Sequence, residues 1–148
     1  MNIRAVDSGD SDAITEVFLS ARSAMTYLPK LHSDAETRDF IRDVVIPDNE
    51  VWVAEESGRV IGFAAFADGS LGHLWVNRTD QNRGVGTALL KVAMDRCSDG
   101  LQLWVFQKNV GARRLYERNG FELAELTDGD GNEEHEPDAR YVWTPSPV

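Results

Sequence analysis

A glycine-containing turn near the middle of the chain has the residue types needed to bind an anion. The run Gln-Asn-Arg-Gly-Val-Gly-Thr occupies residues 81–87, after an apolar strand-like segment and before an amphipathic helical one. At a helix N-terminus the first backbone N–H groups have no intrahelical partner, and the helix dipole adds partial positive charge. Gly84 and Gly86 allow the backbone to approach a ligand closely. The turn therefore predicts a diphosphate site, with Arg83 as a nearby cation.

Two common nucleotide-binding loops do not match this turn. A Walker A loop ends in Gly-Lys-Ser/Thr, whereas this chain continues Gly86-Thr87-Ala88 without the lysine. A dinucleotide fingerprint requires a third glycine, and Leu89 stands at that position. The turn also lies well beyond the first predicted strand. The sequence thus favours a diphosphate carrier of another kind.

The hydrophobic pattern predicts which elements position the turn. Apolar residues at helical spacing predict four helices, and short apolar runs between turn residues predict seven strands. Because the strands at 71–76 and 101–106 flank a helix, we expect them to run parallel through a right-handed crossover. The strand at 101–106 is so apolar that we expect burial of both its faces. The predicted helices cover residues 12–25, 34–45, 85–97 and 109–119, and the predicted strands cover 2–6, 51–54, 60–67, 71–76, 101–106, 121–126 and 140–143.

Composition and charge narrow the class of protein. The 148 residues are 42% hydrophobic, with one cysteine, 25 acidic and 15 basic residues and a net charge of −10. This size and apolar content suit a single domain covering residues 1–148. A lone cysteine excludes an internal disulfide, and we expect no metal. The acidic surplus argues against a nucleic-acid partner. No apolar run approaches the ~20 residues of a membrane-spanning helix, and no signal peptide precedes the first strand, so we expect a cytoplasmic protein with no membrane partner.

Two motifs in the right order resemble the GNAT acetyltransferase superfamily. The pattern Gln-x-x-Gly-x-Gly at 81–86, after a strand ending at Val76, is similar to motif A of that family. The pattern Asn-x-x-Ala-x-x-Leu-Tyr-Glu-x-x-Gly-Phe at 109–121 resembles its motif B. The resemblance covers nearly the whole chain. It implies an α/β (α+β) GNAT fold with a mixed, mostly antiparallel sheet of six to seven strands, a splayed parallel pair and four helices.

The resemblance also implies an activity and a set of site residues. The expected enzyme is an N-acetyltransferase that moves an acetyl group from acetyl-CoA to a primary amine, by direct attack in a ternary complex. Its acceptor is a small molecule or a peptide, and the protein is a monomer or a homodimer. Tyr116 matches the family's tyrosine near the acetyl sulfur and is expected to act as general acid. The expected contacts to acetyl-CoA are Leu74, Trp75, Val76, Gln81, Asn82, Arg83, Gly84, Val85, Gly86, Thr87, Asn109 and Tyr116.

Two alternatives accompany this assignment. Tyr116 also fits a purely structural role, as a core aromatic residue on the apolar stripe of its helix. The whole chain also fits a non-catalytic acyl-CoA-binding module that regulates a partner, because the family's strand carboxylate is replaced by Gly72. Loss of that carboxylate leaves the catalytic base undetermined.

Candidates for the base and for the acceptor site lie elsewhere. His73 has a suitable ordinary pKa, although strand alternation places it opposite Gly72 unless a bulge intervenes. Tyr27 lies between the first two predicted helices, where the family often covers its acceptor, and either lines that pocket or packs in the loop.

An acidic segment at 122–138 contains eight acidic residues and no lysine or arginine. Three interpretations remain open: a solvated face, a wall that attracts a cationic acceptor, or a calcium loop. Glu134 is the preferred contact in the second interpretation and a further candidate base. As a calcium loop, the segment departs from the EF-hand pattern at two positions: Glu133 replaces the turn glycine, and Ala139 replaces the final acidic ligand. The sequence of this segment is similar to that of a bacterial subgroup of GNAT proteins, but this similarity identifies no substrate.

Overall fold

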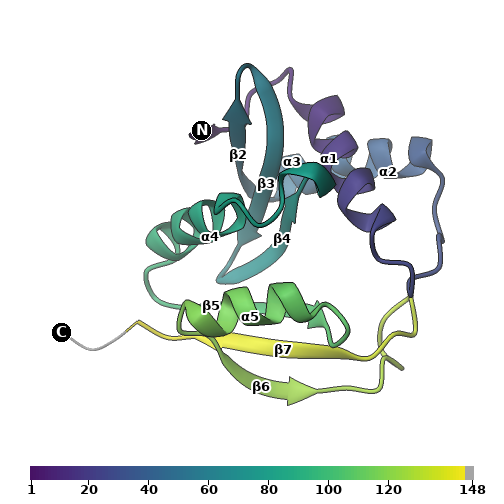
Figure 1. The fold of residues 1–148 in the computed structure, drawn as a ribbon, viewed down its shortest axis with the longest axis vertical. Helices are drawn as coiled ribbons and strands as arrows, with labels where there is room; N and C mark the ends of the chain where they lie inside the picture. The colour runs from purple at the N-terminus through teal and green to yellow at the C-terminus, as the bar shows by residue number, and fades with distance from the viewer. Residues whose placement is uncertain (146–148) are drawn as a thin grey trace.

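A seven-stranded sheet with helices on both faces forms the centre of the molecule (Figure 1). The structure is a computed structural model that describes residues 1–145. The strand order is β1-β2-β3-β4-β5-β7-β6, and within this described range β4 and β5 form the parallel pair while the other neighbours are antiparallel. This is the predicted fold class. The strands are β1 (Asn2–Ala5), β2 (Glu50–Glu56), β3 (Arg59–Ala67), β4 (Ser70–Val76), β5 (Leu101–Phe106), β6 (Glu122–Leu126) and β7 (Asp138–Trp143).

Helices form at the four predicted places. Ser33 begins the second segment with a capping box: its hydroxyl accepts from the Glu36 N–H at 3.1 Å, and the Glu36 carboxylate accepts from the Ser33 N–H at 2.9 Å. This segment continues through a π turn and ends at residue 48, three residues beyond the expected end. The helical elements are α1 (Ser11–Ser23), α2 (Asp34–Phe40), η1 (Ile41–Val45), α3 (Ile46–Asp48), α4 (Val85–Arg96) and α5 (Val110–Arg118).

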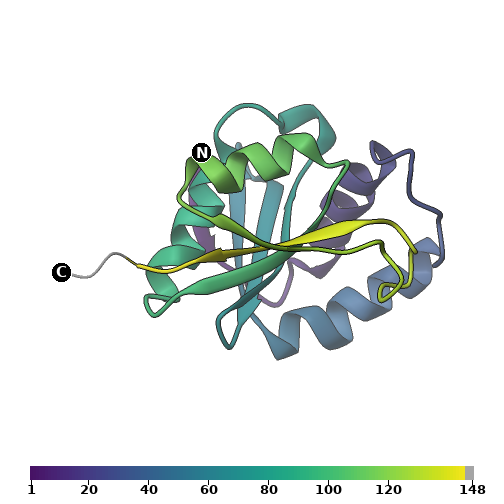
Figure 2. The ribbon, with the colours of Figure 1, turned by 90° about the horizontal axis from the view of Figure 1, so that it is seen from below.

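Two apolar cores lie on opposite faces of the sheet, and Figure 2 shows α5 and α2 on opposite sides of it. On one face α4 and α5 pack with Leu89, Leu90 and Tyr116 against strand residues such as Phe66 and Tyr141. On the other face α1 and η1 pack against β2 and β3 through a second set of residues. That set is Ile14, Val17, Ile41, Val45, Val51, Val53, Phe63 and Ala65.

The expectation that β5 is buried on both faces is wrong. Leu101, Leu103 and Val105 are buried on the face covered by α4 and α5, but Trp104 between them is 50% exposed. Burial of both faces requires helices on each, and α1 packs on β3 and β4 instead of β5. Trp104 is therefore free to face a ligand cavity.

The parallel pairing of β4 with β5 is very short. It consists of Ser70 opposite Gln102 and Leu71 opposite Leu103. Beyond these two pairs each strand keeps its antiparallel partner on the other side, β3 for β4 and β7 for β5. The two strands therefore separate toward their carboxyl ends, as the predicted splayed pair requires.

The segment between β6 and β7 folds into a tight loop around one glycine. Gly129 has a φ of +86°, and a Cβ there would lie 2.4 Å from the backbone carbonyl carbon of Glu136. Both features exclude a side chain, since L-residues rarely adopt this φ and the neighbouring atom is backbone.

We predict that Gly129→Ala lowers the melting temperature by roughly 5 °C or more, because the methyl group must displace the Glu136 backbone. The matched control is Gly131→Ala in the same loop, where a Cβ meets nothing within 4 Å. Thermal unfolding followed by circular dichroism measures both. Equal melting temperatures for the two variants would contradict the assigned packing.

Candidate functional site

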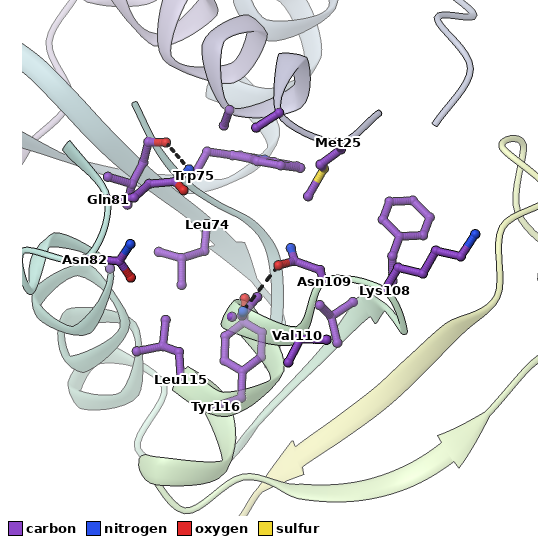
Figure 3. A pocket seen from close by; sticks show the side chains of 18 of the residues that line it. Met25, Leu74, Trp75, Gln81, Asn82, Lys108, Asn109, Val110, Leu115 and Tyr116 are labelled. Atoms are coloured by element: carbon purple, nitrogen blue, oxygen red, sulfur yellow. Dashed lines mark hydrogen bonds between the residues drawn. The ribbon is translucent and has the colours of Figure 1, made fainter. Parts of the chain in front are cut away.

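A cavity of about 610 Å³ occupies the gap where β4 and β5 separate. Its walls come from the ends of both strands, the start of α4 and the first turns of α5, and Figure 3 shows their side chains converging on one space. Residues from segments far apart in the sequence therefore meet here. Of the residues predicted to contact the cofactor, those that line the cavity are Leu74, Trp75, Val76, Gln81, Asn82, Gly84, Gly86, Thr87, Asn109 and Tyr116.

The glycine turn has the backbone conformation of an anion cradle. Asn82 and Gly84 both adopt positive φ angles, +63° and +85°. Asparagine tolerates this region better than most residues, and glycine adopts it freely. Gly84 caps α4 without any side-chain cap, and the first helical hydrogen bond runs from Ala88 N–H to Gly84 at 3.1 Å. The N–H groups of residues 85–87 thus have no intrahelical acceptor and stand at the positive end of the helix dipole.

A buried acid that sequence analysis missed holds this turn in place. Asp80 is 3% exposed, accepts from Asn77 Nδ2 at 2.9 Å and pairs with Arg83 at 2.7 Å. The Asn77 hydrogen bond, helped by Arg59 and Arg83, lowers the pKa of Asp80 despite burial. Arg83 also contacts Glu56 at 2.8 Å. The guanidinium of Arg83 therefore holds the turn against β2, and its predicted contact to the anion stays a prediction.

Asn109 and Tyr116 are presented by α5. Asn109 caps the helix through its Oδ1, which accepts from Ala112 N–H at 3.3 Å, while its side chain lines the cavity (Figure 3). Tyr116 is 6% exposed and packs its ring against Phe121 and Tyr141. Burial raises the pKa of the Tyr116 phenol. The phenol therefore keeps its proton at neutral pH.

His73 lies next to a β-bulge on the α1 side of the sheet. The register between β3 and β4 shifts at Gly72, so Ala65 lies opposite His73 while Phe66 lies opposite Leu71. His73 shares the α1 side with Trp75 by ordinary alternation along β4, stacked on Phe63 and edge-on to Phe18, and the bulge affects only the residues before it. Its Nδ1 accepts from the Trp75 indole at 3.1 Å. Burial, with a smaller effect of the Arg22 charge, lowers the pKa of His73 to about 4. His73 does not line the cavity defined above.

The two predicted acceptor contacts have different surroundings. Tyr27 lines the cavity, and its ring packs edge-on to Phe106 at 6.2 Å. Glu134 is mostly buried but lies 3.6 Å from Arg22 of α1, and it is not among the lining residues. Sequence analysis missed Trp104 and Lys108, which also line the cavity. Lys108 could have been predicted as a cavity residue because it directly precedes Asn109 in the sequence.

Two further expectations concern metals and membranes. Within residues 1–145 no group of three or more histidine, cysteine or acidic side chains is arranged to hold a metal ion. The acidic loop accordingly shows no calcium-type cluster in that range. None of the described helices has the length and apolar character needed to cross a membrane.

Comparison with protein families gives one clear match. Residues 17–121 match the model described as "Acetyltransferase (GNAT) family". A curated relative is the peptidyl-lysine N-acetyltransferase YiaC of Escherichia coli (strain K12), 28% identical over 124 residues. The alignment covers 83% of this chain and 84% of the relative.

Solved structures of similar proteins share the fold along almost the whole chain. YncA from Salmonella typhimurium, solved with its cofactor acetyl-CoA, has a TM-score of 0.77 at 22% identity, with 100% of this chain and 95% of that chain covered. The apo form of YjaB from Escherichia coli has a TM-score of 0.76 at 19% identity, with 98% of each chain covered. At these identities the similarity concerns the fold.

The depressed pKa of His73 predicts a pH dependence of stability. The unfolded chain takes up a proton on this histidine near pH 6.5, whereas the folded chain does so only near pH 4. The free energy of unfolding therefore decreases as the pH falls through this window, by about 1–2 kcal/mol between pH 7 and pH 5. Urea unfolding should show that His73→Phe, which keeps the aromatic packing, removes this part of the slope. Parallel slopes for both proteins would show that His73 titrates normally.

Proposed function

The chain belongs to the acetyltransferase (GNAT) family, and we propose that it transfers the acetyl group of acetyl-CoA directly to a primary amine of a cationic acceptor. Membership makes the protein an acyltransferase, and the acetyltransferase relative supports an enzyme over a non-catalytic acyl-CoA-binding module. The observation that carries the proposal is the joining, in one cavity, of a strand gap, an unsatisfied helix N-terminus and a buried phenol.

The glycine turn and the strand gap fit the two ends of the carrier. In this proposal the N–H groups of residues 81–87 bind the diphosphate of acetyl-CoA. The backbone of Leu74, Trp75 and Val76 has no parallel partner opposite it and accepts the pantetheine arm as an added strand. Asn109 contacts the arm from α5. The thioester then lies between β4 and Tyr116, which both line the cavity.

In this proposal the acetyl group is transferred by direct attack of the acceptor amine on the thioester. The acceptor amine, after losing a proton to solvent or a basic group, attacks the thioester carbonyl carbon, and the C–S bond breaks with the electron pair going to sulfur. Tyr116 donates its phenolic proton to the departing thiolate, and the new amide nitrogen loses its second proton, which restores the phenol through solvent. Burial raises the pKa of a thiol in the same cavity as well, so donor and acceptor shift in the same direction. Because both reactants are held side by side, proximity contributes much of the rate.

The acceptor class follows from the relative and from charge. The relative acts on peptidyl-lysine, and the protein carries a net charge of −10 that attracts cations. We therefore favour an alkyl primary amine, either a lysine side chain or a small-molecule amine.

The binding proposal is tested by calorimetric titration with acetyl-CoA. Gly84→Ala should weaken its affinity about tenfold, because the methyl group enters the diphosphate site. Gly58→Ala is the matched control, since Gly58 has a similar positive φ of +76° and also has open space around a Cβ. The strain of the two variants is then alike. No binding to the wild type would refute the proposed function.

The catalytic role is tested by Tyr116→Phe. This variant keeps the ring packing and should lower kcat about 10²-fold while the KM for acetyl-CoA changes by less than about threefold. Coenzyme A release with 1,5-diaminopentane or Nα-acetyl-lysine amide as acceptor measures both constants. An unchanged kcat would leave Tyr116 with the structural role alone.

A further inference from the structure

A buried acid adjoins the end of the cavity opposite the glycine turn. Figure 3 shows Lys108 and Asn82 on opposite sides of the cavity. Glu136 is 8% exposed, and its Oε2 is buried without a hydrogen-bond partner among the described residues. The Tyr27 hydroxyl is also buried and has no hydrogen-bond partner among the described residues. The activity proposed above uses neither group in a defined way.

Lys108 connects these two groups. Its Nζ lies 3.5 Å from Glu136 Oε2, which is within ion-pair distance but is not a hydrogen bond in the structure. The same Nζ lies 5.6 Å from the centre of the Tyr27 ring, over its face. Tyr27, Lys108 and Glu136 are called the ammonium subsite below. A carboxylate, an aromatic face and a hydroxyl are the groups that bind an alkyl ammonium.

The acidic loop is built to hold Glu136 in this position. The Asn132 side chain brackets it, donating to the Glu136 carbonyl at 2.8 Å and accepting from its N–H at 3.2 Å. Gly129 packs directly against its backbone. Gln107, two residues before the β5–α5 cap, donates its N–H to the Pro137 carbonyl at 2.9 Å. The loop thus presents Glu136, not its neighbour Glu134, toward the cavity residues Tyr27 and Lys108.

Lys108, which occupies the subsite in the free protein, compensates the Glu136 charge only in part. The Lys108 side chain is 61% exposed, whereas the Glu136 side chain is only 11% exposed. A buried carboxylate oxygen without a hydrogen bond is costly, so a cation that is itself less exposed than Lys108 gains by replacing it. Burial and the Glu136 charge raise the pKa of Tyr27, which keeps its hydroxyl neutral, and the hydroxyl oxygen can accept from an ammonium.

We propose, on the basis of the acetyl transfer described above, that Glu136 and Tyr27 bind the alkyl ammonium of the acceptor at the position that Lys108 Nζ occupies in the free protein. The ligand class is a primary ammonium on a flexible aliphatic chain, as Lys108 itself is. Lys108 acts as an intramolecular competitor. Removing Glu136 therefore weakens acceptor binding, whereas removing the Lys108 charge strengthens it.

The test is calorimetric titration with 1,5-diaminopentane, without acetyl-CoA and with it at saturation. Glu136→Gln should weaken binding at least tenfold, and Lys108→Met, which keeps the aliphatic stem, should strengthen it about threefold or more. Glu133→Gln is the matched control, because Glu133 lies in the same loop, is 59% exposed and pairs with His32 at the surface. It should change the affinity by less than twofold.

The outcomes separate this inference from the proposed function. No binding of the diamine to the wild type, equal affinities for Glu136→Gln and Glu133→Gln, or weaker binding by Lys108→Met would overturn the subsite. If Glu136→Gln does not fold, the direction of the Lys108→Met effect decides alone. Acetyl-CoA affinity is measured separately in each protein. Its absence contradicts the proposed function, whereas normal acetyl-CoA binding without an effect of Glu136 contradicts only the subsite.

Discussion

The separation of β4 from β5 after two paired residues is the constraint on which the site depends. Each strand keeps full antiparallel pairing on its outer side, so the sheet remains continuous while its middle opens. Backbone groups at this opening need partners other than a neighbouring strand, because buried N–H and C=O groups are rarely left unsatisfied. A ligand with an extended amide-bearing arm fits such an opening.

The opening has to be held at both ends, and charged side chains do much of this work. At one end Asp80, Arg83 and Glu56 fasten the glycine turn to β2. On the α5 side the Tyr141 hydroxyl donates to Glu117 at 2.6 Å and accepts from Arg113 at 3.1 Å, which fastens α5 to β7. Because these contacts are made by side chains, the backbone N–H groups of the turn stay available. Arg83 therefore has a structural role in the turn, whether or not it also contacts the ligand.

Features determined by nearby residues were predictable from the sequence, and features determined by distant contacts were not. The start of α4 follows from local spacing and residue type, and the position of Tyr116 follows from the family resemblance. The side of His73 follows from strand alternation, whereas the bulge at Gly72, which sets the side of Leu71, is predicted by no local pattern. The exposure of Trp104 depends on which strands α1 covers. Glu134 and Glu136 are two residues apart in one acidic run, and tertiary contacts to Arg22 and Lys108 distinguish them.

The arrangement of Glu136 also depends on how tightly the acidic loop is packed. A carboxylate on a mobile loop would turn toward water, where its hydration free energy exceeds what a single ammonium returns. The tight packing of Gly129 and the Asn132 bracket remove that freedom, so the cost of desolvating Glu136 is met during folding and not during acceptor binding. A preformed acidic position also favours cations over neutral amines, since only a cation compensates the buried charge. In the proposed subsite, the protein thereby loses some stability and gains selectivity for a cationic acceptor. The glycine turn, in the proposed function, selects an anion through backbone dipoles alone.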